Sequence, residues 1–412
     1  MTRTRDLDIV VYGATGFVGR LTADYLARNA PDGTRIGLAG RSRDKLERIR
    51  ETLPGASEWP ILIASADDPD SLTALANATH VVVTTVGPYA RYGIDLVRAC
   101  AEAGTDYTDL TGEVQFARAS IDGYHDVAAA SGARIVHSCG FDSVPSDIGV
   151  HVLHEQVAAD GEGTLADTTL VLSSFRGGVS GGTIDSMRGV VDAAKSDKRT
   201  RSMVLQPYSL SPDVAAEPDL GRQSDSALVK GSDIAPNLKG VTAPHPMASV
   251  NTRVVRRSNA LRGWAYGRTF RYREVTSVGQ SWLSPVVAAG VAAGLGGLVA
   301  GLAFGPTRKL LDRLLPDPGE GPSEKTRNTG HFTTDVYATT TTGARYASRM
   351  RAQGDPGYKA TAVMLGESAL ALALDRDKLP DAAGVLTPAS AIGDALVDRL
   401  RGAGFEISVR RN

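Results

Sequence analysis

The chain has 412 residues, of which 42% are hydrophobic and 22% are charged, the composition of an ordinary globular protein. This length exceeds one ordinary hydrophobic core, so we expect two domains. The chain has 45 Lys and Arg against 46 Asp and Glu, and the net charge of -1 creates no long-range field that would gather nucleic acid. We therefore expect no nucleic-acid partner.

The two cysteines, Cys100 and Cys139, are too few for a disulfide framework or a zinc site. We expect no metal and a reducing compartment. Residues 1–8 are charged and lack the apolar run of a secretory signal. These features predict a cytoplasmic protein, and an apolar segment described below leaves membrane association open.

The first predicted element is an apolar strand that ends at Tyr12 and is followed by glycines at three-residue spacing. A tight turn favours Gly13, close approach to a pyrophosphate favours Gly16, and close packing of the next helix favours Gly19. The N-terminus of that helix would offer its N–H groups to an anion. This unit predicts a dinucleotide site, and the residues expected to contact the ligand are Gly13, Ala14, Thr15, Gly16, Phe17 and Val18.

A second predicted strand, residues 35–40, ends immediately before Arg41. Enzymes that use NAD place an Asp or Glu near this position to accept a hydrogen bond from the ribose 2′-OH. A guanidinium can pair instead with a 2′-phosphate, so Arg41 and the adjacent Ser42 predict NADP(H) as the cofactor. The alternative is that Arg41 merely begins a solvated helix with Asp44 and Glu47.

The next two strands bring further residues to the same edge of the sheet. A strand at 60–65 leads to Ala66 and Asp67, which we expect near the adenine, and to Asp68, which is equally suited to cap the following helix. A strand at 80–86 ends in a turn that we expect at the cofactor, formed by Val86, Gly87 and Pro88. Tyr89 would then lie on the nicotinamide side, or else be an exposed aromatic residue in a turn.

A helix at 93–103, a strand at 106–110, another helix and a strand at 134–137 complete a predicted domain of about six strands, residues 1–150. The loop that follows contains Cys139 and Gly140, expected at the cofactor, and Asp142 and Ser143, expected at the reacting atoms. A purely structural reading is also open, because Ser143, Pro145 and Asp147 suit the start of a helix.

The middle of the chain, residues 151–353, is predicted to form a second domain. It has a strand at 167–175, a glycine-rich loop at 177–183 that would line a substrate site or act as a hinge, and a long irregular excursion at 207–246. Paired strands are expected at 332–338 and 344–350. Residues 359–374 and 391–403 predict helices, and 405–409 a terminal strand.

Residues 275–307 contain no charged residue, and 285–304 are almost entirely Val, Ala, Gly, Leu and Phe. The length suits a membrane span, but glycine and alanine make the hydrophobicity low. Three interpretations remain open: contact with or insertion into a bilayer through 283–315, a self-association surface or a wall around an apolar substrate, and an ordinary buried helix. Leucines at 310, 311, 314 and 315 continue the segment as an amphipathic turn.

Several motifs together resemble the saccharopine dehydrogenase-like oxidoreductases. They are the glycine turn with Arg41, Val86-Gly87-Pro88-Tyr89, Tyr107-Thr108-Asp109-Leu110-Thr111-Gly112-Glu113, Gly140-Phe141-Asp142-Ser143-Val144-Pro145-Ser146-Asp147, Ser180-Gly181-Gly182-Thr183, and the turns at 319–324 and 354–358. The chain looks most similar to the branch of trans-acting enoyl reductases, which serve polyketide lipid assembly.

The resemblance implies an α/β fold: an N-terminal Rossmann domain with a doubly wound sheet, an inserted second α/β (α+β) domain, and a C-terminal segment, 354–412, whose helix returns to the Rossmann domain. It implies NADPH-dependent reduction of an activated carbon–carbon double bond in a long acyl or polyketide chain, free or bound to a carrier. A homodimer is compatible with it.

In such a reaction hydride reaches the β-carbon, and a donor stabilises the charge that builds on the carbonyl oxygen. The candidate catalytic residues are Tyr89, Ser143 and Asp142: the donors would be Tyr89, Ser143 and the backbone N–H groups from Gly140 to Asp142, and Tyr89 or water would return a proton to the α-carbon. Two alternatives remain: a ketone or imine reductase of the same family, and a lipid-associated binding protein that holds the dinucleotide without turning it over.

Overall fold

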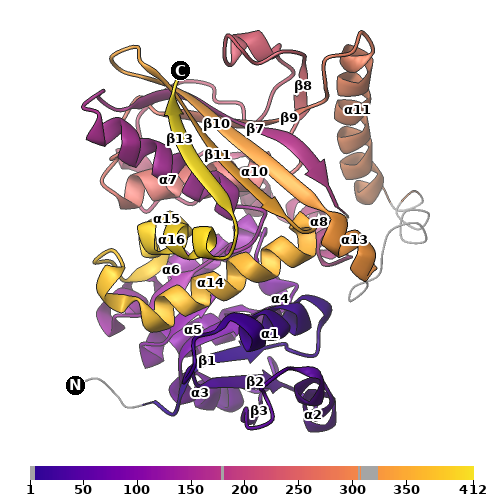
Figure 1. The fold of residues 1–412 in the computed structure, drawn as a ribbon, viewed down its shortest axis with the longest axis vertical. Coiled ribbons are helices and arrows are strands. Elements are labelled where there is room, and N and C mark those ends of the chain that lie inside the picture. Colours follow the sequence, from indigo (N-terminus) through magenta and orange to yellow (C-terminus); the bar gives the residue numbers. More distant parts are fainter. Residues whose placement is uncertain (1–4, 178–180, 305–306, 308–322) are drawn as a thin grey trace.

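The computed structural model describes residues 5–177, 181–304, 307 and 323–412, which form two sheets with helices around and between them (Figure 1). A seven-stranded sheet has the order β12-β6-β5-β4-β1-β2-β3, and a six-stranded sheet has the order β13-β11-β10-β7-β9-β8. The N-terminal half of the chain forms nearly all of the first sheet. The fold class predicted from the sequence is confirmed.

All strand pairs of the first sheet are parallel. Its strands are β1 (Leu7–Tyr12), β2 (Ile36–Gly40), β3 (Ile61–Ile63), β4 (Thr79–Thr84), β5 (Asp106–Thr108), β6 (Arg134–Val136) and β12 (Gly384–Leu386). The strand order reverses between β1 and β4, so the crevice beyond the carboxyl ends of these two strands is where a doubly wound sheet binds ligands.

Alternate residues of β1 belong to two different cores, as a sheet covered on both faces requires. Ile9 and Val11 pack with α1 (Phe17–Asn29), α2 (Arg43–Thr52) and α14 (Thr361–Leu374). Val10 and Tyr12 pack with the helices of the other face, α3 (Pro69–Ala78), α5 (Ile94–Ala103) and α6 (Val114–Ser131). The short helix α4 (Tyr89–Tyr92) follows β4.

The second sheet is mostly antiparallel. It contains β7 (Leu165–Arg176), β8 (Thr242–Pro244), β9 (Arg271–Ser277), β10 (His331–Thr340), β11 (Arg345–Gln353) and β13 (Glu406–Arg411). The helices in the same part of the chain are α7 (Val144–Ala159), α8 (Gly181–Ser196), α9 (Lys198–Leu205), α10 (Ala248–Leu261), α11 (Ser284–Ala303) and α13 (Glu324–Thr329). The strands predicted at 167–175, 332–338 and 344–350 are confirmed.

The C-terminal segment contributes a strand to each sheet. The sequence predicted only that its helix returns to the first domain. Helix α14 packs on α1 and the first sheet, and β12 extends that sheet beside β6. After α15 (Pro388–Ala391) and α16 (Asp394–Gly402), β13 pairs with β11 in the second sheet. The segment thus ties the two sheets together, and the helix predicted at 391–403 is broken at Gly393, which has a φ of 56°.

Helix α10 was not predicted from the sequence, and it carries three arginines. Arg253, Arg256 and Arg257 are buried, and their guanidinium groups donate to backbone carbonyls and to Asp225. A buried guanidinium that finds such acceptors avoids most of the cost of desolvation. The helix therefore lies between the two sheets rather than on the surface.

Candidate functional site

The glycine turn after β1 has the shape that the sequence predicts. Gly13 has a φ of 89°, and a Cβ there would lie 2.7 Å from Cγ2 of Val86. A Cβ at Gly19 would lie 2.2 Å from the carbonyl oxygen of Gly13, so α1 packs directly on the turn. Gly16 is exposed and caps α1 without any side-chain hydrogen bond. The turn and the helix N-terminus are therefore open to an anionic ligand.

Arg41 lies exposed at the carboxyl end of β2, with Ser42 as the N-cap of α2. The structure shows no ion pair between Arg41 and any described carboxylate, including those of Asp44 and Glu47. The solvated-helix alternative is therefore weakened, and the guanidinium is available to a 2′-phosphate.

Tyr12, which the sequence did not single out, links three predicted cofactor residues. Its hydroxyl is close to Arg41 and Asp67 and to the backbone of Ala66, and burial raises its pKa to about 12. Asp68 caps α3 by accepting a hydrogen bond from the N–H of Ser71, so of its two readings the capping role is the one observed. The ends of β1, β2 and β3 form one continuous surface.

The turn at Val86, Gly87 and Pro88 lies against the glycine turn. The hydroxyl of Thr85 donates to the carbonyl oxygen of Gly13 at 3.3 Å, and the Gly87–Pro88 peptide is cis. These residues line the same edge as Gly13 and Ala14, as predicted. Together with Arg41, this cradle fits a phosphorylated dinucleotide: bulk is excluded where the backbone must approach it, and a free cation stands at the end of β2.

Tyr89 does not face a ligand, and the prediction that placed its hydroxyl at the nicotinamide needs correction. The side chain is 6% exposed, its hydroxyl donates to the carbonyl oxygen of Thr84, and it accepts from the N–H of Leu110, both at 3.2 Å. Burial raises the pKa of this hydroxyl well above its usual value. The ring packs on Phe116, so Tyr89 holds the turn in place instead of donating a proton.

Ser143 is also enclosed. It has no exposed surface, and its hydroxyl donates to Oδ1 of Asn251 at 3.1 Å. The amide of Asn251 in turn donates to Glu274, whose other oxygen accepts from Tyr272 at 2.9 Å. Ser143 therefore anchors its loop to α10 and β9 and is not a direct donor to substrate. Asn251 and Glu274 are more than 100 residues away in the chain, and no local pattern could have revealed them.

Cys139 and Gly140 reach the site only through their backbone. The Cys139 thiol is buried, which raises its pKa well above the usual value, and its N–H donates to the carbonyl oxygen of Asp109 at 2.8 Å. A Cβ at Gly140 would lie 2.7 Å from Leu110, so this turn packs closely on the end of β5.

Asp142 has the properties of a proton donor. The residue is partly exposed, yet desolvation raises the pKa of its carboxyl to about 6. Desolvation is the whole cause of this shift, and no hydrogen bond from the described residues holds the carboxylate. A carboxyl with a pKa of about 6 and no hydrogen bond from the described residues can supply a proton in mildly acidic to neutral solution, which suits general acid catalysis.

The C-terminal segment connects Asp142 to the glycine turn. Phe17, at the start of α1, packs edge-on against Tyr358, with ring centroids 5.0 Å apart. Tyr358 belongs to a short π-helical turn, Pro356–Ala360, that leads into α14. The first residue of α14, Thr361, accepts a hydrogen bond from the N–H of Phe141 at 3.0 Å. Tyr358 and Thr361 thus place the loop of Asp142 beside the dinucleotide cradle.

Aromatic side chains from the second sheet lie next to this loop. Phe141 contacts Phe332 of β10 and Phe175 of β7, with ring centroids 4.8 and 6.3 Å apart. Phe175 is 45% exposed and Phe141 is partly exposed, so these two rings present an apolar surface to solvent above the buried Phe332. Part of the glycine-rich loop predicted at 177–183 as a substrate wall or hinge lies outside the described residues.

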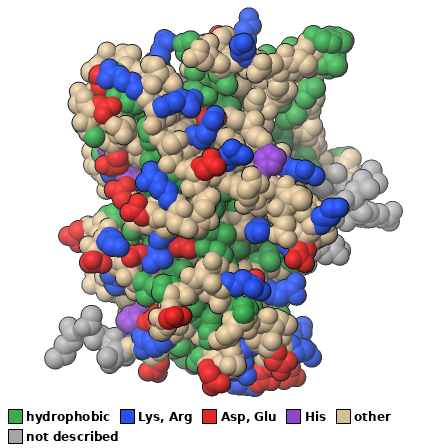
Figure 2. All heavy atoms as spheres, viewed as in Figure 1, with side chains coloured by type: hydrophobic (Ala, Val, Ile, Leu, Met, Phe, Trp, Pro, Cys, Tyr) green, Lys and Arg blue, Asp and Glu red, His purple; other side chains and the backbone are tan. Residues whose placement is uncertain are grey.

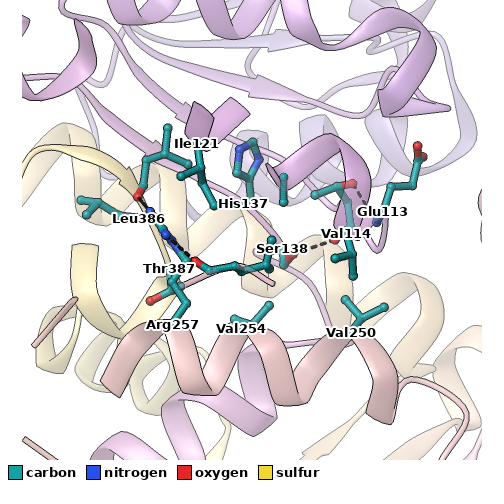
Figure 3. Close-up of a pocket in the computed structure, with 14 residues that line it drawn as sticks. Glu113, Val114, Ile121, His137, Ser138, Val250, Val254, Arg257, Leu386 and Thr387 are labelled. Carbon is teal, nitrogen blue, oxygen red and sulfur yellow. Dashed lines mark hydrogen bonds between the residues drawn. The ribbon is translucent and has the colours of Figure 1, made fainter. Parts of the chain in front are cut away.

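A separate cavity of about 20 Å³ lies behind the site, and Figure 3 shows its lining. Arg257 of α10 extends along it and donates to the carbonyl oxygen of Leu210 at 2.6 Å and to that of Val385. Burial lowers the pKa of Arg257 to about 9. The cavity has room for about one water molecule, so it is not the site of a dinucleotide or of an acyl chain.

Comparison with known proteins supports the assignment of the cofactor. Residues 9–136 match the family described as the saccharopine dehydrogenase NADP binding domain. This range contains the glycine turn, Arg41 and the Val86–Pro88 turn. The cofactor is therefore NADP(H), as the sequence predicted.

Relatives are similar over the whole chain. A protein of Mycobacterium tuberculosis, whose name assigns it provisionally to the trans-acting enoyl reductases, is 56% identical over 100% of this chain and 99% of its own length. A trans-acting enoyl reductase of Mycobacterium bovis is 51% identical over 99% of this chain and 98% of its own. The solved saccharopine dehydrogenase (L-Glu forming) of Saccharomyces cerevisiae covers 98% of this chain with a TM-score of 0.54 and 13% identity, a likeness of fold alone.

Proposed function

The chain belongs to the family of the trans-acting enoyl reductases, and on this premise we propose that it uses NADPH to reduce an activated carbon–carbon double bond in a long acyl chain. The observation that carries the proposal is Asp142: an unbonded carboxyl with a pKa of about 6, joined to the glycine turn through Thr361, Tyr358 and Phe17.

Bound NADPH supplies the hydride that goes to the β-carbon of the double bond, and the electron pair of that bond moves toward the carbonyl oxygen. The chain must then stabilise an enolate oxygen. The N–H of Phe141 is bonded to Thr361, but those of Gly140 and Asp142 have no hydrogen-bond partner among the described residues. These two backbone groups support a role as donors to the oxyanion.

Asp142 completes the reaction by giving its proton to the α-carbon, so that the product gains one hydride and one proton and the carboxylate is left to be reprotonated from solvent. Its residual exposure provides that route. No hydrogen bond from the described part of the chain to the Asp142 carboxyl must be broken before the transfer.

The apolar surface beside this loop supports the proposal that the substrate is a long acyl chain. The exposed Phe175 and the partly exposed Phe141, which pack over the buried Phe332, suit the alkyl part of an acyl thioester. The loop contains no cluster of cations that would hold two amino-acid carboxylates. We propose an acyl or polyketide chain that arrives as a thioester, free or on a carrier.

Isotope transfer tests the proposal. NADPH deuterated at the reactive carbon is supplied with trans-2-enoyl thioesters of graded chain length, and the product is analysed by mass spectrometry and NMR. We expect deuterium on the β-carbon of a saturated thioester. Deuterium on an alcohol or amine carbon, after reaction with ketone or imine substrates only, would support the related reductases instead. Tight NADPH binding without turnover of any probe would indicate a binding protein.

A further inference from the structure

Helix α11 presents an unusual surface. It is 20 residues long, contains no charged side chain, and is long and apolar enough by composition to cross a membrane. Yet only 12% of its most apolar window is buried. Figure 1 shows it standing at the edge of the second sheet, and Figure 2 shows hydrophobic side chains over its upper part. A surface helix of a protein that meets only water carries polar residues on its outer face.

One stripe of α11 packs on β8 and α8, as shown by the partly or fully buried Ser284, Ala288, Val291, Ala292, Leu295, Leu298 and Leu302. Apart from the partly buried Gly301, the rest of the described circumference is exposed and consists of Pro285, Val286, Val287, Ala289, Gly290, Ala293, Gly294, Gly296, Gly297 and Ala300. Because each residue turns the helix by about 100°, the exposed positions cover an arc of about 200°. A Cβ added at Gly290, Gly294, Gly296 or Gly297 would meet nothing within 4 Å.

The width of this arc distinguishes between partners. A second helix, such as α11 of another copy, covers an apolar stripe of about 100° and would leave half of the arc in water. A bilayer surface can cover the whole arc. Large apolar residues are exposed at both ends, with Trp282 86% and Phe304 62% exposed, as is typical of residues at a membrane interface.

Charge and connectivity determine how the helix would lie. Figure 2 shows Lys and Arg side chains near its lower end, and Arg308 and Lys309 follow it in the sequence, which suits anionic headgroups. The chain enters α11 from β9 and returns to β10 of the same sheet, and residues 305–323 are too rich in charge to cross a bilayer a second time. The helix is therefore suited to lie in the plane of the interface.

We propose that α11 docks this protein on an anionic bilayer surface, with the outer arc in the boundary between headgroups and acyl chains. This role is independent of the reaction proposed above. It would hold the enzyme at the surface from which a lipid-borne acyl chain is presented.

Vesicle flotation tests the proposal with the full-length protein and vesicles of phosphatidylcholine mixed with phosphatidylglycerol. The test variant is Ala289→Asp with Ala293→Asp, at two exposed positions in the middle of the arc. The control is Ala129→Asp with Ala130→Asp, at two exposed alanines of α6. We expect the wild type and the control to float and the test variant to lose binding by about tenfold or more, because a carboxylate is costly in the interface. Unchanged circular dichroism and NADPH affinity would show that the test variant is folded.

Two further measurements separate the outcomes. Brominated lipids should quench the fluorescence of the wild type, and Trp282→Phe should remove most of that quenching. Light scattering should find the same mass for the wild type and the test variant. A wild type that stays in the soluble fraction, or a test variant that floats equally well, overturns the proposal. If the wild type forms a dimer but does not bind vesicles, and the test variant is a monomer, the partner of α11 is a second copy of the chain. This result also overturns the proposal.

Discussion

Oε1 of Glu113 accepts a hydrogen bond from the backbone N–H of Tyr89 at 2.9 Å, although the two residues are 24 positions apart. The second carboxylate oxygen accepts from the N–H of Ala90 at 2.8 Å. Both groups lie at the start of α4, where N–H groups lack partners within the helix. Glu113 thus holds the segment that follows the Val86–Pro88 turn, and with it the wall of the cofactor cradle.

Replacing Glu113 with Gln should destabilise the fold by about 1 to 3 kcal/mol, because the new NH₂ group faces a backbone N–H and leaves it unsatisfied. Urea unfolding followed by circular dichroism measures this change. Glu102→Gln on the exposed side of α5 is the matched control and should change stability by less than about 0.5 kcal/mol. Equal midpoints for the two variants would contradict the role assigned to Glu113.

Replacing Arg41 with Ala should weaken NADPH binding by about 10- to 100-fold, the equivalent of one charge-assisted hydrogen bond to the 2′-phosphate. NADH, which lacks that phosphate, should bind the variant and the wild type equally. Calorimetric titration with both nucleotides measures the difference. Arg48→Ala, at another exposed arginine of α2, should leave both affinities unchanged. Equal losses for NADPH and NADH would mean that Arg41 supports the fold and not the phosphate.

Replacing Asp142 with Asn should lower kcat by about 100-fold or more if the carboxyl donates the proton. The pH profile gives a sharper test. Burial raises the pKa of Asp142 to about 6, so the protonated, active form is lost as the pH rises through that value. The kcat of the wild type should therefore fall above about pH 6. The residual activity of the Asp142→Asn variant should not show this fall. The control variant, Asp126→Asn on α6, should keep both the wild-type kcat and its fall above about pH 6. A wild-type kcat that rises with pH would contradict the assignment.

Replacing Asn251 with Asp should destabilise the protein in a pH-dependent way. The new carboxylate would take the place of an amide nitrogen that lies 2.9 Å from Oε2 of Glu274, so two buried carboxylates would face each other. At about pH 8 the two carboxylates at positions 251 and 274 repel each other. At about pH 5.5 a proton shared between them relieves the repulsion, so part of the lost stability should be recovered. Asn251→Ala, which removes the hydrogen bonds without adding charge, should lose a similar stability at both pH values. Urea midpoints at the two pH values test this difference.

The residues that could be predicted from the sequence are those whose role depends on the backbone next to them. Gly13 and Gly19 stand where a Cβ would collide, and Arg41 follows the second strand directly, so a pattern of a few residues is enough to locate them. The long uncharged segment at 285–304 was likewise recognisable as a helix, because nothing in its sequence interrupts it.

The roles of Tyr89 and Ser143 could not be predicted from the residues next to them in the sequence. Both follow strands at the correct edge, but whether a side chain there points to a ligand or into the protein depends on partners from distant parts of the chain. The backbone N–H of Leu110 donates to the hydroxyl of Tyr89, and Oδ1 of Asn251 accepts from the hydroxyl of Ser143. Asp142 lies next to Ser143 in the same loop, and its carboxyl has no such partner within the described ranges of the chain, a difference that no local pattern encodes.

The sequence by itself determined the parallel sheet, the phosphate turn and the choice of NADP(H), because these depend on the local conformation of the chain and on residues close together in it. Only the tertiary structure decided which polar groups of the cleft remain free. The C-terminal segment closes the cleft by adding one strand to each sheet, and Thr361 and Tyr358 bring the Asp142 loop to the glycine turn. Contacts between residues more than 200 positions apart place this loop, and desolvation there raises the pKa of the Asp142 carboxyl.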